Sequence, residues 1–486
     1  MTRLIAILLF TLGTAQAELP PYRANTNSPA TETGVSPDGS TLLHRAVEAG
    51  EINRVKALIA QGARVGSTNR YGISPLWIAC RDGHEAIVQS LLAAKADPNT
   101  LRPGGETVLM TASRTGHPGV VRALLEAGAK IDAKDRRGQT AVMWAAAEGH
   151  VQVIESLISA GADFRSPLDS GFTPLLFAVR EGRAEVVHRL IKAGADINES
   201  IEAKRRASRG PQTGMTPLLM AVENGHFELA LDLVKAGANP NDQRAGYTAL
   251  HNITWVRKPD HGEGEDGMPP PAGSGKVSSL DFVRQLVKAG ADINARVEKP
   301  NTGLGVLNRK GATPFLLAAK TADLALLKLL RDLGTDPSIN TTEGVTPLIA
   351  AAGLGTLAAG EVAGTEDEVL ETLRWLVSIG QDVNAVDANG ETAMHAAAYK
   401  NLPKAVEFLS SHGARIEVWN QKDRHGWTPL LIAEGFRPGN FKPSFETIAA
   451  IHQAMKIAGV TPPPPTKADG INNSDFGPRD RKYTQP

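Results

Sequence analysis

One short pattern recurs along the chain at a fixed interval, and this recurrence restricts the fold more than any other feature. In residues 171–198, GFTPLLFAVREGRAEVVHRLIKAGADIN, Thr173-Pro174 has the form of a helix start. Threonine offers a capping oxygen there, and proline lacks the N–H that the first helical turn leaves unpaired. Two apolar segments at helical spacing follow, separated by Glu181-Gly182 and ended by Gly194, which is typical of a helix C-cap. Helices this short are not stable alone in water, so the unit needs neighbours.

The same helix start occurs eleven times, and the first five starts are spaced by 33 residues. Their first residues are Thr41, Ser74, Thr107, Thr140, Thr173, Thr216, Thr248, Thr313, Thr346, Thr392 and Thr428. A 33-residue period with a T-P-L-H-like start and a G-A-D-x-N-like end resembles the ankyrin repeat. The resemblance implies an all-α repeat solenoid of about eleven repeats over residues 38–460, each with two antiparallel helices and a β-hairpin finger. It also implies a non-enzymatic role in binding other proteins.

Insertions are expected in the carboxyl-terminal half, because the period breaks there. A helix pair cannot absorb ten or more extra residues without losing its layer, so the additions are predicted to be loops. The predicted insertions are residues 199–213, 257–278, 296–309, 354–367 and 436–444. The amino-terminal half is regular, and residues 445–458 are predicted to form a last helix.

The two ends of the chain are expected to lie outside the repeats. Residues 1–17 have a positive start at Arg3, an apolar stretch at 4–12 and small residues around a cleavage point after Ala17, which together predict a signal peptide. We therefore expect export to the periplasm or the medium. The apolar stretch is too short to span a membrane, so no span is expected in the mature chain. Residues 18–37 are predicted to be a flexible linker and 461–486 a disordered proline-rich tail.

Charge and cysteine content exclude some classes of function. The chain has 52 basic and 52 acidic residues, and this zero net charge argues against nonspecific binding of nucleic acid. Cys80 is the one cysteine, so no intrachain disulfide can form, and its first-helix position predicts a small buried residue rather than a reactive thiol. We expect a monomer without a cofactor.

Histidines are predicted to be structural, because seven of the twelve fall at repeat positions. His44, His251 and His395 lie in first helices, and His84, His117, His150 and His226 precede second helices. Where Trp77 replaces the first-helix histidine, we expect a polar link between repeats to be lost. No metal site is expected from these histidines, and the acidic stretch 261–266 fits a solvated loop better than a cation site. No nucleophile elbow, phosphate loop or dinucleotide fingerprint occurs.

A partner-binding face is expected on the concave side, which finger tips and exposed first-helix positions line in ankyrin proteins. Arginine, tyrosine and tryptophan are the side chains that anchor interfaces. The candidates are Arg70, Tyr71, Arg81, Arg114, Arg136, Arg137, Phe172, Arg180, Arg244, Tyr247, Trp255, Lys310, Lys320, Tyr399 and Trp427. The basic cluster at 204–209 fits either a grip on an acidic partner or a solvated loop.

Two alternatives remain beside a protein-binding scaffold. An enzyme or metal site could lie in the insertions at 257–309 and 354–367, where departures from the repeat concentrate. A secreted effector could use the same binding face and differ only in its destination.

Overall fold

The computed structural model describes residues 35–202, 213–259, 271–299, 307–356, 359–360, 362–436 and 442–464. The chain divides between Met220 and Ala221 into two compact units, here called unit 1 and unit 2. The predicted signal peptide, the clusters at 204–209 and 261–266, and the tail from 465 lie outside the described residues. No helix among the described residues is long and apolar enough to cross a membrane.

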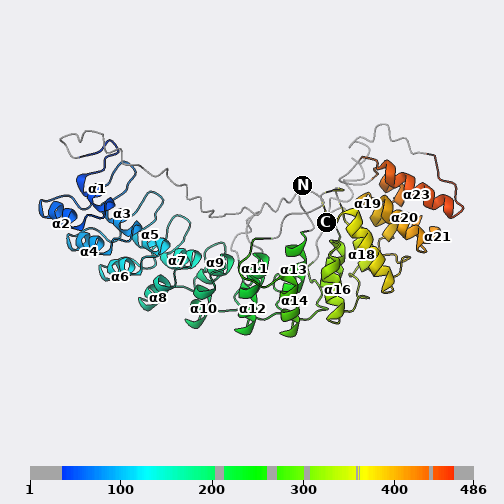
Figure 1. Cartoon of the computed structure of the whole chain (residues 1–486), viewed down its shortest axis with the longest axis horizontal. Helices are drawn as coiled ribbons and strands as arrows, with labels where there is room; N and C mark the ends of the chain where they lie inside the picture. Colours follow the sequence, from blue (N-terminus) through cyan, green and yellow to red (C-terminus); the bar gives the residue numbers. More distant parts are fainter. Residues whose placement is uncertain are drawn as a thin grey trace. The chain divides into compact units, whose positions relative to one another are not determined.

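Unit 1 consists of helix pairs (Figure 1). Its first helices are α1 (Leu42–Glu48), α3 (Pro75–Arg81), α5 (Val108–Thr115), α7 (Ala141–Glu148) and α9 (Pro174–Arg180). Its second helices are α2 (Ile52–Ala60), α4 (Glu85–Ala93), α6 (Pro118–Glu126), α8 (Val151–Ser159) and α10 (Ala184–Lys192). Helix α11 (Pro217–Glu223) contains the boundary between the units.

Unit 2 continues with α12 (Phe227–Lys235), α13 (Ala249–Arg257), α14 (Ser279–Lys288), α15 (Pro314–Lys320), α16 (Leu324–Asp332), α17 (Pro347–Ala351) and α18 (Glu366–Ser378). It ends with α19 (Ala393–Lys400), α20 (Pro403–Ser411), α21 (Ile416–Trp419), α22 (Pro429–Ala433) and α23 (Phe445–Ile457). This all-α repeat architecture confirms the predicted fold class.

The recurring threonine or serine sets where each first helix begins. Each of the eleven predicted residues lies directly before a helix. Thr173 Oγ1, for example, accepts a hydrogen bond of 3.2 Å from the Leu176 N–H, and Ser74 Oγ accepts one of 3.1 Å from the Trp77 N–H. These bonds satisfy N–H groups that have no partner inside the helix, which is why the motif predicted the helix starts so well.

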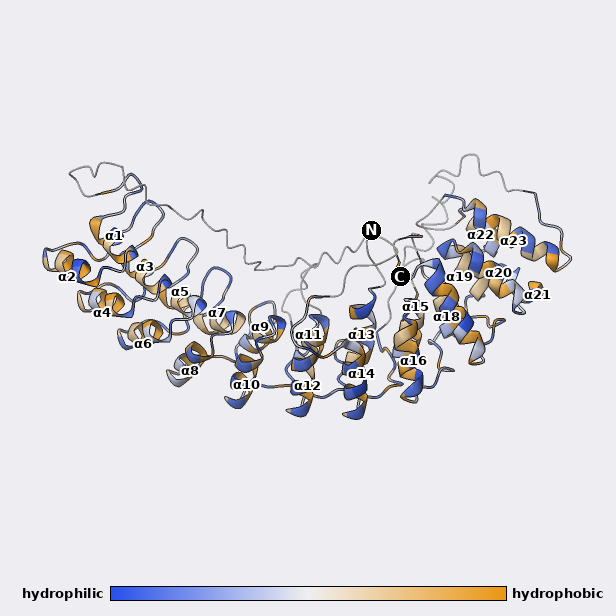
Figure 2. Ribbon diagram, in the orientation of Figure 1, coloured by the Kyte–Doolittle hydropathy of each residue, from blue (hydrophilic) through white to orange (hydrophobic). Residues whose placement is uncertain are grey.

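The core lies between successive helix pairs. First helices pack on first helices, as in α3–α5–α7–α9, and second helices pack on second helices, as in α4–α6–α8. In α10, Val186, Val187 and Leu190 are buried, whereas Glu185 faces solvent. Figure 2 shows this division, since the helices carry both hydrophobic and hydrophilic residues. Each helix pair therefore buries its apolar side against its neighbours, as a thin layer must.

The connection from each second helix to the next first helix is here called a finger. The fingers were expected to be β-hairpins, but the described residues contain no regular strand, and an isolated bridge joins Leu101 and Thr107. Tight turns shape the fingers instead. The carboxylate of Asp135, for example, accepts hydrogen bonds of 2.8 Å from the N–H groups of Arg137 and Gln139.

Backbone hydrogen bonds join neighbouring fingers at their tips. In unit 1 the Arg136 N–H donates to the Gly104 carbonyl (3.2 Å), and the Arg70 N–H donates to the carbonyl of Asp38, in the turn before α1 (2.9 Å). In unit 2 the Thr342 N–H donates to the Lys310 carbonyl (2.9 Å) in the same way. The fingers of each unit are therefore aligned by main-chain bonds that do not depend on side-chain identity.

Two features of unit 2 differ from the prediction. The insertion predicted at 354–367 ends two residues early, because Thr365 caps α18 together with Glu368, and Glu366 and Asp367 form the first helical turn. The short helix α21 lies where only a finger was expected. The predicted last helix at 445–458 is confirmed as α23, with Ala458 as its C-cap.

Candidate functional site

The first helices and fingers of unit 1 form one face of that unit, here called the finger face (Figure 1). Arg81, Arg114 and Arg180 occupy equivalent positions on it, each seven residues after the residue that caps its own helix. These three residues are here called the arginine row. Because they share a register, they recur at a fixed offset along the stacked helices α3, α5 and α9.

Arg81 is held between an aromatic ring and a carboxylate. Its guanidinium carbon lies 5.3 Å from the centroid of the Trp77 ring, and the guanidinium of Arg102, from the next finger, lies 4.6 Å from the same ring. Two nitrogens of Arg81 bind the Asp82 carboxylate at 2.6 and 2.7 Å. This pairing raises the pKa of Arg81, so the side chain stays charged and fixed in direction.

Arg114 is held in the same manner. Its guanidinium carbon lies 5.8 Å from the Trp144 ring, and its Nη2 lies 3.4 Å from Glu106 Oε1. Glu106 also binds Arg102 at 3.1 Å, so one finger carboxylate joins two arginines of neighbouring elements.

Arg180 repeats the arrangement at the end of α9. Its guanidinium carbon lies 5.2 and 5.4 Å from the rings of Phe177 and Phe172, and its Nε lies 2.8 Å from Glu181 Oε1. All three arginines of the row therefore combine a cation–π contact with an ion pair, although each uses different neighbours.

The finger tips of unit 1 carry a second basic set. Arg70, Arg136 and Arg137 are exposed, and Tyr71 is 68% exposed. Arg70 and Arg136 form no ion pair with any of the described residues. The tips therefore present positive charge and an aromatic ring to solvent beside the arginine row.

Four of the predicted candidates are buried, so the expectation that they are exposed is wrong. Phe172 packs on Phe177 with 5.1 Å between ring centroids and closes the stack. Tyr247 packs edge-on against Trp255 at 4.9 Å, and burial raises the pKa of its hydroxyl. Lys320 and Tyr399 are each 4% exposed, because the insertion that follows α17 and the last fingers cover them.

The remaining candidates of unit 2 are accessible but serve local contacts. Arg244 is exposed and binds Asp242 at 2.6 Å, and half-buried Trp427 stacks on His425 at 4.9 Å. Half-buried Trp255 lies 5.1 Å from the Arg309 guanidinium. Lys310 is exposed at a finger tip.

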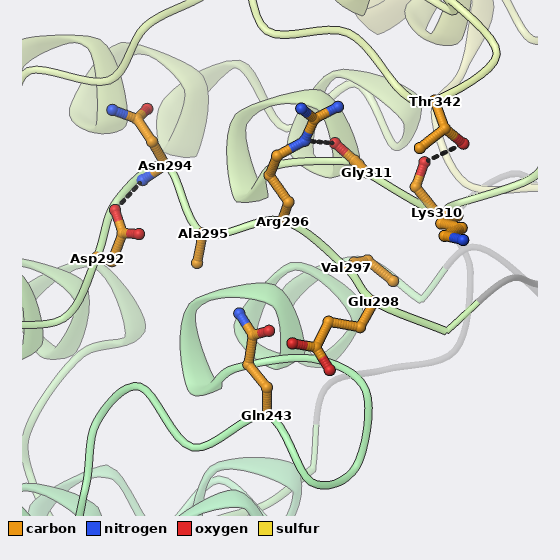
Figure 3. Close-up of a pocket in the computed structure, with 10 residues that line it drawn as sticks. All are labelled: Gln243, Asp292, Asn294, Ala295, Arg296, Val297, Glu298, Lys310, Gly311 and Thr342. Atoms are coloured by element: carbon orange, nitrogen blue, oxygen red, sulfur yellow. Dashed lines mark hydrogen bonds between the residues drawn. The ribbon is translucent and has the colours of Figure 1, made fainter.

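Lys310 also lines a cavity of about 480 Å³ between three successive fingers of unit 2 (Figure 3). The lining residues are Gln243, Asp292, Asn294, Ala295, Arg296, Val297, Glu298, Lys310, Gly311 and Thr342. Arg296 is fixed there, because its Nε donates to the Gly311 carbonyl (3.0 Å) and its Nη2 to the Asn340 carbonyl (2.8 Å). The lining mixes both charges and contains no arrangement typical of a catalytic centre.

The repeat histidines hold neighbouring repeats together. His44 Nε2 lies 3.0 Å from the Ile73 carbonyl of the next finger, and His150 Nε2 lies 2.9 Å from the Arg114 carbonyl in α5, the first helix of the preceding repeat. The expectation that Trp77 removes a polar link is wrong, because its indole Nε1 donates to Thr111 Oγ1 at 2.9 Å. No group of three metal-binding side chains occurs among the residues that the structure describes.

Sequence reasoning missed the aromatic and acidic parts of the site. Trp77, Trp144, Arg102 and Glu106 were not among the candidates, although they position the arginine row. Their spacing contains a usable signal, since each tryptophan comes three or four residues after a helix cap and one turn before the position of the row. Cys80 is fully buried as predicted, and burial raises the pKa of its thiol.

Comparison with known families identifies the repeats. A model described as ankyrin repeats (3 copies) matches residues 22–102, 43–135, 109–201 and 361–440, and a model of the single ankyrin repeat matches 213–244. These matches cover more than half of the chain. Ankyrin repeats generally mediate protein–protein interaction.

Curated relatives share the repeats over part of their length. Human neurogenic locus notch homolog protein 1 is 32% identical over 160 residues, which is 32% of this chain and 5% of that protein. A probable 26S proteasome regulatory subunit of Saccharomyces cerevisiae is 31% identical over 129 residues, which is 26% of this chain and 50% of the relative. The matches thus span a small part of the notch proteins and half of the proteasome subunit. Together with the stacked helix pairs, the family matches show that this chain belongs to the ankyrin repeat family.

Proposed function

We propose that this protein is an exported, non-enzymatic scaffold that binds a partner protein through the finger face of unit 1. One observation carries the proposal: three arginines at equivalent positions are each fixed over an aromatic ring and remain partly accessible. Arginine and aromatic side chains are the groups that anchor protein interfaces. Side chains that are already ordered lose less conformational entropy on binding, which favours affinity.

The exposed tips extend the same face. Arg70, Arg136 and Arg137 add positive charge next to the arginine row, and Tyr71 adds apolar area with a hydroxyl group. A partner with acidic residues along its contact surface would associate faster with such a face than a neutral partner.

A charge-reversal experiment tests the proposed face. The partner is first captured from envelope and medium fractions, identified by mass spectrometry and purified. Its affinity is then measured for the wild type and for a variant with Arg70, Arg136 and Arg137 each replaced by Glu. We expect at least about tenfold weaker binding, since both attraction and contacts are lost.

The matched control reverses three exposed basic residues of second helices: Lys56→Glu, Arg122→Glu and Lys192→Glu. It changes the net charge equally but leaves the finger face intact. Equal binding by the two variants, with both folded by circular dichroism, would rule out this face.

Export rests on the sequence of residues 1–17 and needs its own test. Expression of the full chain in a Gram-negative host, followed by fractionation and amino-terminal sequencing, should give a mature protein that begins at Glu18 outside the cytoplasm. A variant with Leu8→Arg and Leu9→Arg should stay in the cytoplasm, because the apolar stretch is interrupted. Partition between periplasm and medium distinguishes an envelope scaffold from a secreted effector. We also propose a monomer, which light scattering of the purified protein would check.

A further inference from the structure

In unit 2, a segment of the chain itself lies against the ends of first helices. In unit 1, the corresponding position is where we propose that the partner binds. The insertion that follows α17 passes close to the ends of α15 and α19, and buried lysines of these helices bind its main chain. Lys320 Nζ donates to the Leu354 carbonyl at 3.2 Å. Lys400 Nζ donates to the carbonyls of Ala363 and Gly364 at 2.8 and 2.7 Å.

The contact requires small residues in the insertion. A Cβ atom on Gly353 would lie 2.5 Å from Lys400 Cβ, and one on Gly355 would lie 2.4 Å from the backbone nitrogen of Leu307. Both distances are shorter than real contacts of Cβ atoms, and both glycines have positive φ, 113° and 79°. The insertion therefore lies close to Lys400 and Leu307 because residues 353 and 355 are glycines.

One of the two lysines of unit 2 corresponds in register to the arginine row of unit 1. Lys320 comes seven residues after its cap, Thr313, as Arg81 does after Ser74. Lys400 lies one position further along its own helix. In unit 2 these basic groups are 4% and 5% exposed and bind main-chain carbonyls, whereas the side chain of Arg81 remains 37% exposed.

From this correspondence we propose that the arginine row of unit 1 binds an extended, glycine-containing peptide segment of the partner, whose main-chain carbonyls accept hydrogen bonds from Arg81, Arg114 and Arg180. This inference rests on the proposed function and specifies its partner. Lys320 serves as the template, because in this register its Nζ binds a main-chain carbonyl in the same molecule, although the segment that it binds is built of turns.

The chemistry of the row fits a main chain. A guanidinium has five N–H donors, and the Asp82 pair uses two nitrogens of Arg81, so further donors point away from the carboxylate. The paired carboxylates of Asp82 and Glu181 can accept the N–H groups of the same peptide. At the intervening α7, the equivalent residue is the buried Ala147, whose side chain offers no donor, so this repeat contributes no contact of this kind.

The length of the segment follows from the repeat spacing. Packed helices lie about 10 Å apart and an extended chain rises about 3.3 Å per residue, so one repeat corresponds to about three residues. Arg81 and Arg180 are separated by three repeat steps. A peptide of about nine or ten extended residues would therefore reach all three arginines.

A peptide-display selection on the full chain tests the inference. A random library of peptides about 12 residues long is enriched on the immobilised protein, and the enriched peptides are synthesised with a fluorescent label. Binding is measured by anisotropy to the wild type and to the triple variant Arg81→Met, Arg114→Met and Arg180→Met. We expect glycine-containing peptides to be enriched and their affinity for the triple variant to fall about tenfold or more.

Two further variants sharpen the result. Replacement of the row by lysines should keep most of the affinity, because Lys320 and Lys400 bind carbonyls in unit 2. The control Arg54→Met, Arg122→Met and Arg189→Met, on second helices, should not change binding. Thermal unfolding confirms that each variant is folded.

Thioamides distinguish main-chain from side-chain recognition. A thioamide at a contacted position weakens the carbonyl as an acceptor, so we expect three positions at which affinity falls, two of them about three residues apart and the third about six residues away. Loss of binding only when acidic side chains of the peptide are replaced would overturn main-chain recognition. Failure to enrich any peptide that depends on the arginine row would also overturn it. If a folded partner still binds and needs Arg70, Arg136 and Arg137, the proposed function stands and only this inference fails.

Discussion

At the scale of single residues, the last fingers of unit 2 contain an unusual carboxyl group. Glu391 lies just before the cap of α19, and burial, with Asp387 and Asp423 close by, raises the pKa of its carboxyl to about 8. Arg424 and a hydrogen bond with Tyr399 oppose this shift and do not cancel it. Glu391 therefore holds a proton at neutral pH in the folded protein.

Glu391→Gln should make the stability of the protein less dependent on pH. Unfolded Glu391 has the ordinary glutamate pKa of about 4.3, so the folded form binds the extra proton and the free energy of unfolding falls as pH rises from there to about 8. Urea unfolding should show that the free energy of unfolding falls less in the variant than in the wild type between pH 5 and pH 9. The difference between the two proteins should be on the order of 2 kcal/mol. The same pH dependence in both proteins would contradict this assignment. Glu417→Gln, at an exposed position of α21, is the control.

Residue roles could be predicted where the repeat itself sets them. Threonine caps and repeat histidines satisfy backbone groups of their own or the neighbouring repeat, so their register determines their contacts. Burial of Phe172, Lys320 and Tyr399 could not be predicted, because it depends on segments outside the repeat pattern or on a neighbouring ring. For the same reason Trp77 and Trp144 were not predicted as part of the site, because their role depends on the cation–π contacts that Arg81 and Arg114 make with their rings.

At the scale of elements, the buried lysines Lys320 and Lys400 bind main-chain carbonyls of the insertion after α17. Lys400→Met removes the donor to the carbonyls of Ala363 and Gly364. We expect the insertion to detach and to be cleaved by elastase, which prefers small residues, many times faster than in the wild type. Limited proteolysis with mass spectrometry of the fragments would locate the cut between α17 and α18.

Lys328→Met, at an exposed position of α16, is the matched control and should leave the rate of cleavage unchanged. Equal protection of both variants would show that the buried lysine does not hold the insertion in place. The helix pairs themselves should stay intact in either case, because their caps and cores are untouched.

Helix positions were predictable from the sequence to within one or two residues, because caps and glycines mark them. The exceptions have local causes. Helix α18 includes the last two residues of the predicted insertion, because Thr365 and Glu368 form a reciprocal cap at its start. The four-residue helix α21 has no side-chain cap, so the sequence contains no capping residue from which its start could be predicted.

At the scale of the whole molecule, side-chain bonds join neighbouring repeats within each unit, and the ion pair of Lys258 with Glu368 in unit 2 reaches across one further repeat. Histidine and arginine side chains reach one repeat along, as Arg183 does when its Nε donates to the Ala147 carbonyl at 2.9 Å. Stability in such a stack is the sum of repeat and neighbour terms. Sequence periodicity predicts that stack well, whereas the division into units after Met220 was not predicted, although the period first breaks just before it, at residues 199–213.

Cys80 offers a probe of unit 1 in the intact protein. Its thiol is fully buried in α3, and burial raises its pKa, so we expect no reaction with a thiol reagent under native conditions. One equivalent should react as denaturant unfolds unit 1. Leu101→Cys in a Cys80→Ala background is the control, because Leu101 is 59% exposed and its replacement should react at once. Rapid reaction of native Cys80 would contradict tight packing of α3.

The finger between α14 and α15 has a consequence for engineering. Its link to the preceding finger is the Glu298 N–H to the Gly246 carbonyl (2.9 Å), and its link to the following finger leaves from the Lys310 carbonyl. Val297 and Ala312 close its base, with the Val297 N–H 2.9 Å from the Ala312 carbonyl. These three bonds come from the described residues on either side of the finger, Val297 and Glu298 before it and Lys310 to Ala312 after it. A guest domain, such as a fluorescent reporter, inserted between Lys299 and Leu307 would leave these three bonds in place, so we expect this finger to tolerate a fusion.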